Sequence, residues 1–380
     1  MELILFNYTE KKGWSVDEFP KFDSEQTMVL IFGGSNYFDN NKPFQQLVEA
    51  YPNSHIVGCS TAGEILNNHI YDQSLSVAVI RFEKVNIKTC SELINSPEDS
   101  FEIGQSIAKK LLEPDLRYIL ILSIGLEVNG TELVNGFRKI LPPKIIITGG
   151  LAGDGSNFKK TWVINNKLPS SNCITGIGFY GDDIILSHGS KGGWDIFGPE
   201  RVITKSNGSI LYEIDGYPAL ELYKQYLGKL AKNLPSSALL FPLAIRKNEN
   251  NKEYIVRTIL SVDTEQQSMT FAGDVPQDWT CQLMRANFDR LIEGATDASR
   301  MAINELTSKQ APLLLIAISC VGRRLILGER AEEEVEATLE LLPESTQQIG
   351  FYSYGEISPS GLANCDFHNQ TMTITIIGEK

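Results

Sequence analysis

The chain has 380 residues, of which 42% are hydrophobic, enough to bury the cores of two domains. A formal net charge of −13 repels polyanions over most of the surface and argues against nucleic acid as a partner. The longest apolar runs, Ile119–Ile124 and Leu313–Ile318, are far shorter than the roughly 20 residues of a membrane-spanning helix, so we expect no membrane span.

The chain start and the cysteine spacing both favour a cytoplasmic protein. Met1–Phe6 carries no basic leader before an apolar stretch. The cysteines are scattered and form no C-x-x-C pair: Cys59, Cys90, Cys173, Cys281, Cys320 and Cys365. This spacing argues against a zinc ribbon or a thioredoxin-type centre and fits reduced thiols.

The first predicted unit is a strand, a helix and a second strand. Met28–Phe32 is a short apolar run that stops at a glycine pair, and helical spacing follows within Phe44–Val48. The chain returns as His55–Val57, makes the turn Gly58–Ile65 and continues into an alternating strand at Leu75–Phe82.

A second unit repeats this order. Tyr118–Ile124 predicts a strand and Glu132–Ile140 a helix, after which Lys144–Thr148 runs into the glycine-rich segment Gly149–Gly155.

Short apolar runs joined by glycine-rich turns predict an antiparallel region in the middle of the chain, at Cys173–Phe179, Ile184–Ser187 and Val202–Thr204. An amphipathic helix is predicted at Leu211–Leu227, although Gly216 and Pro218 interrupt its start. We place the boundary between two lobes near Ser206–Ser209, which gives lobes of 1–207 and 208–380.

The last unit resembles the first. Pro312–Cys320 predicts a strand, and Ala331–Leu342 predicts an acidic helix that Pro343 ends. Its closing turn, Gly350–Ile357, shares the pattern G-x-x-[S/T]-x-G-E-I with Gly58–Ile65, which suggests an internal duplication.

These observations predict an α/β (mixed α+β) fold with two related lobes of mixed sheets and flanking helices. Weaker echoes of the shared turn occur at Leu151–Asp154 and Phe271–Asp274. The glycine lets the backbone pass closely beside a neighbouring strand, and the acid after it could line a pocket. Alternatively, these are tight turns whose acids accept hydrogen bonds from local donors. The sequence leaves both interpretations open.

Common catalytic patterns are missing from the sequence, so we expect no enzyme. There is no phosphate loop, no H-E-x-x-H and no G-x-S-x-G. Gly176–Gly181 spells G-x-G-x-x-G, but a strand follows it, which predicts a hairpin and not a dinucleotide site. A thiol-dependent enzyme using Cys59 or Cys320 is an alternative, although a small thiol at a strand end is more often packed in a core.

A cofactor that needs one axial ligand, such as haem b, requires a single suitable side chain facing an apolar cavity. His188 and His368 are candidates, while His368 could also be a hydrogen-bonded histidine at a strand entrance. Arg323 and Arg324 follow an apolar strand, at the end where open α/β sheets bind ligands, and we expect at least one guanidinium there. It could bind the carboxylate of an amino acid or a haem propionate, or could neutralise Glu356 or the helix Glu332–Glu336.

Four segments together resemble the FIST family, with its N-terminal and C-terminal domains in order: Gly58–Ile65, Asp215–Ala219, Ser319–Arg323 and Gly350–Ile357. The resemblance implies a ligand sensor in signal transduction. Amino acids have been proposed as ligands of the family, and a stand-alone bacterial subset binds haem and senses nitric oxide through partner histidine kinases. This chain has no kinase, cyclase or methyl-acceptor segment and so resembles that subset.

A sensor of this kind would pass its output to a separate signalling protein such as a histidine kinase. The candidate ligand-binding residues lie in or near the matching motifs: Cys59, Thr61, Glu64, Cys320, Arg323, Tyr352, Ser353, Tyr354, Glu356 and Asn369. The candidate cofactor ligands are His188 and His368, and no catalytic or metal-binding residue is predicted. An amino-acid sensor without haem, which would use Arg323 and Glu356, is the main alternative.

Overall fold

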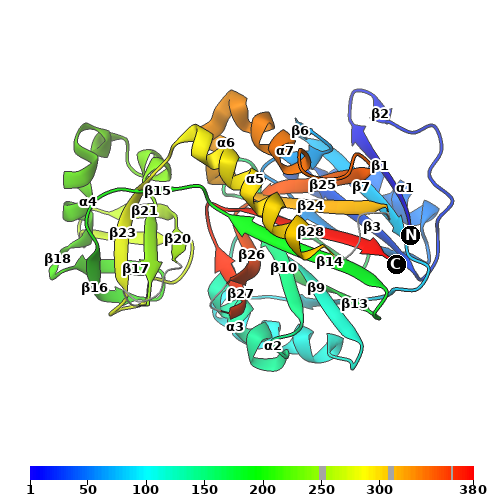
Figure 1. Cartoon of the computed structure of the whole chain (residues 1–380), viewed down its shortest axis with the longest axis horizontal. Helices are drawn as coiled ribbons and strands as arrows, with labels where there is room; N and C mark the ends of the chain where they lie inside the picture. Colours follow the sequence, from blue (N-terminus) through cyan, green and yellow to red (C-terminus); the bar gives the residue numbers. More distant parts are fainter. Residues whose placement is uncertain (248–253, 307–311, 361–362) are drawn as a thin grey trace.

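A computed structural model describes residues 1–247, 254–306, 312–360 and 363–380. Figure 1 shows two bodies of unequal size. The large body contains three mixed sheets, and the small lobe, formed by the segment from β15 to β23, lies to one side of it. The mixed α+β class predicted from the sequence is confirmed. Within the described residues, no helix is long and apolar enough to cross a membrane.

Three copies of one unit build the large body. In each unit the first two strands are parallel, and the last strand runs antiparallel to the first. The first unit contains β3 (Thr27–Gly33), α1 (Lys42–Ala50), β4 (His55–Ser60), the hairpin of β5 (Glu64–Leu66) and β6 (His69–Tyr71), and β7 (Ser74–Arg81). The second contains β9 (Leu116–Ser123), α3 (Gly130–Ile140), β10 (Ile146–Leu151), the hairpin of β11 (Val163–Asn165) and β12 (Leu168–Ser170), and β13 (Cys173–Tyr180).

The third unit closes the chain with two helices between its parallel strands. It contains β24 (Leu313–Cys320), α6 (Val321–Leu327), α7 (Ala331–Leu339), β25 (Thr346–Ser353), the hairpin of β26 (Gly355–Ser360) and β27 (Ala363–His368), and β28 (Met372–Glu379). An outer strand pairs antiparallel with the last strand of each unit: β1 (Glu2–Thr9), β8 (Asn86–Leu93) and β14 (Ile184–Lys191). The repetition is therefore threefold, and the weak echo at Leu151–Asp154 belongs to the second copy.

Each unit lends its hairpin to the sheet of another unit. β5 of the first unit pairs with β25 of the third, β26 of the third pairs with β10 of the second, and β11 of the second pairs with β4 of the first. The exchange is cyclic, so every sheet contains strands from two units. One continuous apolar core therefore joins the beginning and the end of the chain.

A ring of three backbone hydrogen bonds joins the units where their second strands end. The Ala62 amide donates to the Tyr352 carbonyl (2.8 Å), the Tyr354 amide to the Leu151 carbonyl (3.1 Å) and the Gly153 amide to the Ser60 carbonyl (2.9 Å). The strands approach so closely here that a Cβ atom on Gly153 would lie 2.8 Å from the Ala62 nitrogen. Glycine at this position therefore permits the close approach of the backbones.

An acidic residue follows each arm of this ring, and we call Glu64, Asp154 and Glu356 the corner acids. Glu64 accepts hydrogen bonds from the amide (3.0 Å) and the hydroxyl (2.8 Å) of Ser74, and Glu356 from the amide (3.1 Å) and the hydroxyl (3.0 Å) of Thr371. Thr61 and Ser353 donate to Glu64 and Glu356 in the same way. The interpretation of these turns as acids that accept local hydrogen bonds is confirmed.

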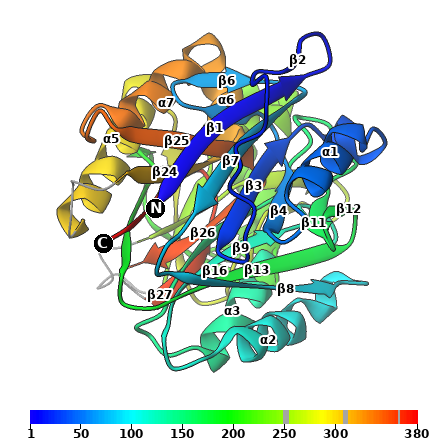
Figure 2. The ribbon, with the colours of Figure 1, turned by 90° about the vertical axis from the view of Figure 1, so that its right-hand side faces the viewer.

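Helices cover the outside of the three sheets, as Figure 2 shows for α1, for α2 with α3, and for α5 with α7. The helices not yet placed are α2 (Ser100–Leu111) and α5 (Phe288–Glu305). Short elements complete the large body: β2 (Gly13–Trp14) and the 3-10 turns η1 (Ser35–Phe38), η2 (Pro97–Asp99) and η5 (Gly328–Arg330). The predicted Gly176–Gly181 hairpin is wrong, because β13 and β14 belong to different sheets.

The small lobe is an antiparallel sheet with its own apolar core. Its strands are β15 (Asp195–Ile196), β16 (Arg201–Asn207), β17 (Ile210–Ile214), β18 (Tyr217–Pro218), β19 (Leu243–Arg246), β20 (Ile255–Arg257), β21 (Ile259–Asp263), β22 (Ser268–Phe271) and β23 (Thr280–Arg285). Its helical segments are α4 (Ala219–Leu227), η3 (Gly228–Asn233) and η4 (Ser236–Leu240). The helix predicted at Leu211–Leu227 is wrong in its first part, because β17 and β18 precede Pro218 and the helix begins after it. The echo at Phe271–Asp274 lies in this lobe and outside the three units.

Two of the corner acids, Glu64 and Glu356, make the stability of the fold depend on pH. Burial raises the pKa of Glu64 to about 7 and that of Glu356 to about 8, from 4.5. The folded chain therefore binds protons that the unfolded chain has released, so the free energy of unfolding falls as the pH rises from about 4.5 to 8. Each carboxyl group lowers the free energy of unfolding by roughly 3 to 5 kcal/mol over this pH range. We expect Glu64→Gln and Glu356→Gln each to remove the contribution of the group that it replaces.

Urea unfolding between pH 4.5 and 8.5 measures this effect. The exposed Glu18→Gln change is the control, since it removes one carboxylate from the surface. Parallel pH profiles for the wild type and both corner variants would contradict the assignment.

Candidate functional site

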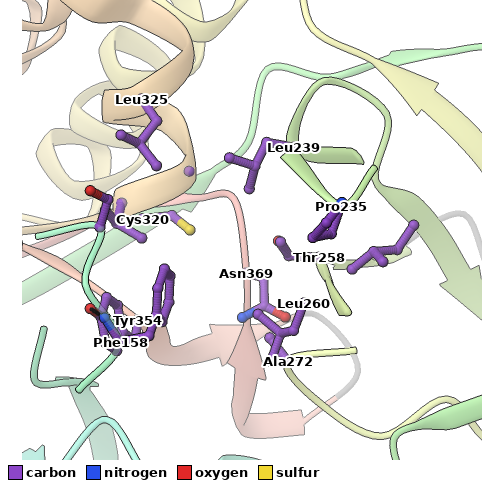
Figure 3. A pocket seen from close by; sticks show the side chains of 14 residues that line it. Phe158, Pro235, Leu239, Thr258, Leu260, Ala272, Cys320, Leu325, Tyr354 and Asn369 are labelled. Carbon is purple, nitrogen blue, oxygen red and sulfur yellow. Dashed lines mark hydrogen bonds between the residues drawn. The ribbon is translucent and has the colours of Figure 1, made fainter. Parts of the chain in front are cut away.

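A cavity of about 300 Å³ lies between the two bodies. The large body contributes Ser156, Phe158, Cys320, Val321, Gly322, Leu325, Tyr354 and Asn369, and the small lobe contributes Pro235, Leu239, Thr258, Ile259, Leu260 and Ala272. Figure 3 shows the labelled side chains of the two bodies on opposite sides, with Asn369 between them. We call this space the interlobe cavity.

Asp154, the corner acid of the second unit, holds one wall of the interlobe cavity. Its carboxylate accepts hydrogen bonds from the backbone amides of Phe158 (2.8 Å), Lys159 (2.8 Å) and Lys160 (2.9 Å) and from the Tyr354 hydroxyl. The rings of Phe158 and Tyr354 stack with centroids 4.4 Å apart and planes 15° from parallel. A buried acid thereby fixes two aromatic side chains that line the cavity.

Asn369 lies in the turn between β27 and β28, two residues before the Thr371 that Glu356 holds. Its side chain is 1% exposed, and neither its amide nitrogen nor its amide oxygen has a hydrogen-bond partner among the described residues. The hydroxyl of Thr258, on the small lobe, is also buried without a partner there. Buried polar groups are nearly always paired, so these two groups are available to pair with a bound molecule or with water.

Gln370 strengthens this reading, because its fully buried side-chain amide also has no partner among the described residues. The amide packs against Gly322, where a Cβ atom would lie 2.4 Å from the Gln370 Nε2. Gly322 itself lines the interlobe cavity. Gln370 itself does not line the cavity, so its amide lies behind a lining residue and Asn369 is the amide at the wall.

Three of the residues predicted as ligand-binding line this cavity: Cys320, Tyr354 and Asn369. The corner acids Glu64 and Glu356, with Thr61 and Ser353, instead form the buried hydrogen bonds described above. Tyr352 is fully buried and donates to Glu334 at 3.0 Å. Cys59 is buried in the apolar core. The turns that carry Glu64 and Glu356 meet in the ring of backbone hydrogen bonds, and neither acid lines the cavity.

Arg323 does not reach the cavity. Its fully buried guanidinium forms an ion pair with Glu334 of α7 (2.5 Å) and donates to the Leu291 carbonyl (2.7 Å). The predicted pairing of Arg323 with Glu356 across a pocket is therefore replaced by the alternative pairing with the acidic helix. Packing of α6 against α7 explains the choice, because it brings Glu334 directly to the guanidinium.

The two candidate cofactor histidines also lie elsewhere. The Nε2 of His188 on β14 is 3.6 Å from a carboxylate oxygen of Glu305, and the Nε2 of His368 on β27 is 3.3 Å from the Ser358 carbonyl. Burial lowers the pKa of His368 to about 4. Neither lines the interlobe cavity. The residues of this cavity therefore do not fit haem held by an axial histidine.

The thiols show no sign of activation. Burial raises the pKa of Cys59 and of Cys320, which disfavours the reactive thiolate. The described residues also contain no cluster of His, Cys, Asp or Glu that could hold a metal ion. The described lining of the interlobe cavity offers amide, hydroxyl, thiol and apolar groups to a bound molecule.

Family models identify the chain. The FIST N domain matches residues 27–217, and the FIST C domain matches residues 219–359. The chain belongs to the FIST family. FIST domains are sensory domains of signal-transduction proteins, and the interlobe cavity takes residues from both, since Phe158 lies in FIST N and Tyr354 in FIST C.

Other comparisons give this FIST protein no more specific activity. An uncharacterized protein of Methanocaldococcus jannaschii, MJ1623, is 23% identical over 378 residues, which cover 88% of this chain and 70% of the relative. The crystal structure of a cyanuric acid hydrolase from A. caulinodans aligns over 78% of this chain and 99% of its own, with 9% identity and a TM-score of 0.20. A score this low supports no conclusion about fold or activity.

Sequence reasoning missed the contribution of the small lobe to this FIST cavity. Thr258 lies between β20 and β21, and Leu260 lies within β21. Neither residue belongs to a recognisable motif. Phe158 follows the weak echo at Leu151–Asp154, and a third repeat recognised there could have pointed to it.

The unpaired amide of Asn369 makes a prediction about the ligand-free protein. Asn369→Leu removes polar groups that lack partners, so we expect the free energy of unfolding to change by less than about 1 kcal/mol. Gln348 is the matched control: its buried amide accepts from the Thr338 hydroxyl (2.6 Å) and donates to the Asn67 carbonyl (2.8 Å). Gln348→Leu leaves those groups unpaired and is expected to lose about 1 to 3 kcal/mol or more.

Urea unfolding of the two variants provides the measurement. An equal loss in both would mean that the Asn369 amide is already paired in the ligand-free protein.

Proposed function

We propose that this FIST protein is a sensor that binds a small molecule in the interlobe cavity and passes the signal to a separate protein. One observation carries the proposal: the unpartnered Asn369 amide of the large body faces the same cavity as the unpartnered Thr258 hydroxyl of the small lobe. Ligand pockets are typically apolar, contain a few placed polar groups and occur between domains. The interlobe cavity has each of these properties.

A ligand bound here would couple to the position of the small lobe. The chain enters that lobe once, after β14, and leaves it once, before α5. A molecule that contacts Asn369 and Thr258 together favours lobe positions in which both contacts form, so binding shifts the population of conformations. A partner protein that contacts both bodies can distinguish the two populations.

The cellular compartment of the protein and the identity of its signalling partner are proposed on separate grounds. All six cysteines are free, which fits a reducing compartment such as the cytoplasm. A histidine kinase as the receiving protein is implied by the resemblance to the stand-alone members of the family. Co-purification of a kinase that binds the chain only with or only without ligand would support that assignment.

Haem and nitric oxide sensing come from the same resemblance. Since neither His188 nor His368 lines the interlobe cavity, we propose an organic ligand there in place of haem. A visible spectrum recorded during haem addition tests this choice. A Soret shift that changes on addition of nitric oxide would restore the haem sensor.

Filling the interlobe cavity should abolish ligand binding. Leu260 is 46% exposed at the cavity, so Leu260→Trp adds bulk there without disturbing a core. Leu93, which is 53% exposed on β8, offers the matched control Leu93→Trp. In a thermal-shift screen of metabolites, a ligand at about 100 times its Kd stabilises the wild type by about 2.7 kcal/mol.

We expect Leu260→Trp to lose that stabilisation and Leu93→Trp to keep it. Ala272→Phe, which fills the same cavity from the small lobe, should behave like Leu260→Trp. Compounds that stabilise all four proteins equally would place the ligand site elsewhere.

A further inference from the structure

We propose that the ligand is an uncharged molecule with an apolar body and one amide-like edge, which pairs with the Asn369 side chain. This inference rests on the proposed function, because it names the class of molecule that the interlobe cavity takes.

The Asn369 side chain determines the shape of that edge. A carboxamide offers one acceptor oxygen and one donor nitrogen side by side, and both are unpartnered and buried here. A ligand that satisfies both must present a donor and an acceptor in the same arrangement, as amides, lactams, cyclic imides and nucleobases do. Rotating the Asn369 amide by 180° exchanges its donor and acceptor and leaves this requirement unchanged.

The lining of the cavity selects against charge. Among the described residues, all of the side chains that line it are uncharged. The nearby Arg323 is occupied by Glu334 and by backbone carbonyls. A carboxylate or an ammonium group that entered this cavity would lose its hydration without gaining an opposite charge, which is strongly unfavourable.

The remaining walls favour a compact apolar body. Phe158 and Tyr354 present stacked aromatic rings, and Leu239 and Leu325 face the cavity from the two bodies. A volume of about 300 Å³ is at the lower end of the range for small-molecule pockets. The Thr258 hydroxyl supplies a further polar contact from the small lobe, so a molecule paired with Asn369 can contact both bodies.

Three probes that differ at a single group test this inference on the full chain. Benzamide carries a donor and an acceptor, acetophenone replaces the NH₂ group by a methyl group, and benzoate replaces it by a charged oxygen. Ligand-observed NMR titration gives their dissociation constants. We expect benzamide to bind the wild type at least about tenfold more tightly than either analogue, because only benzamide satisfies both atoms of the Asn369 amide.

Variants at Asn369 connect that preference to the residue. Asn369→Asp keeps the shape and replaces the donor by an acceptor, and Asn369→Leu removes both polar atoms. Asn369→Leu should abolish the preference for benzamide. The carboxylate of Asn369→Asp can accept only from the NH₂ group of benzamide, so benzamide should bind this variant more weakly than the wild type because its carbonyl loses a donor. Asn86→Asp makes the same charge change at an exposed position on β8 and should keep the preference. Thermal unfolding of each variant confirms that it is folded, and Asn369→Leu is the variant that decides the test.

The outcomes separate this inference from the proposed function. Equal binding of the three probes, a preference that survives in Asn369→Leu, or no binding of any probe to the wild type would each overturn the inference. In the last case ordered water is the partner of the Asn369 amide. The proposed function still stands if another compound binds the wild type and loses binding in Leu260→Trp, and it falls if no compound does so.

Discussion

The close meeting of three strand ends is the constraint on which the structure depends. Three backbone hydrogen bonds form a ring between Ser60 to Ala62, Leu151 to Gly153 and Tyr352 to Tyr354. The chain leaves this crowded point through tight turns. Each turn buries an acid that accepts hydrogen bonds from residues further along the chain and so fixes the segment that follows. The cyclic exchange of hairpins follows from the same geometry, since each turn sends its hairpin onto the neighbouring sheet.

The corner acids connect this constraint to the interlobe cavity. Asp154 orders the segment that carries Phe158 and binds the hydroxyl of Tyr354, and Glu356 holds Thr371 close to Asn369. None of the three acids lines the cavity, so replacing one would act on the structure around it and not on a direct contact with a ligand. Glu64, whose hydrogen bonds go to Ser74 at the start of β7, stabilises the first unit away from the cavity. Asp154 and Glu356 thus support the interlobe cavity, whereas Glu64 supports only the fold.

Local patterns predicted the elements of the large body well. Runs such as Met28–Phe32 and Leu313–Ile318 are buried strands, because apolar stretches of this length fit the middle of a sheet. The exchange of hairpins was not predictable, because the pairing of β26 with β10 joins segments about two hundred residues apart and has no local signal. Arg323 was assigned to a pocket from its place after a strand, whereas the partner that decides its role, Glu334, depends on how two helices pack. Asn369 was proposed from its position near the last motif. The reason to place it in a ligand site is structural, because its buried amide has no hydrogen-bond partner among the described residues.

In the proposed complex one molecule pairs with Asn369 and contacts the small lobe. A crystal structure of the full chain soaked with benzamide tests it most directly. We expect the probe in the interlobe cavity, with its amide within hydrogen-bond distance of both polar atoms of the Asn369 side chain and its ring between the two bodies. A probe bound elsewhere, or an Asn369 amide that pairs with the protein while the probe turns its own amide away, would contradict it.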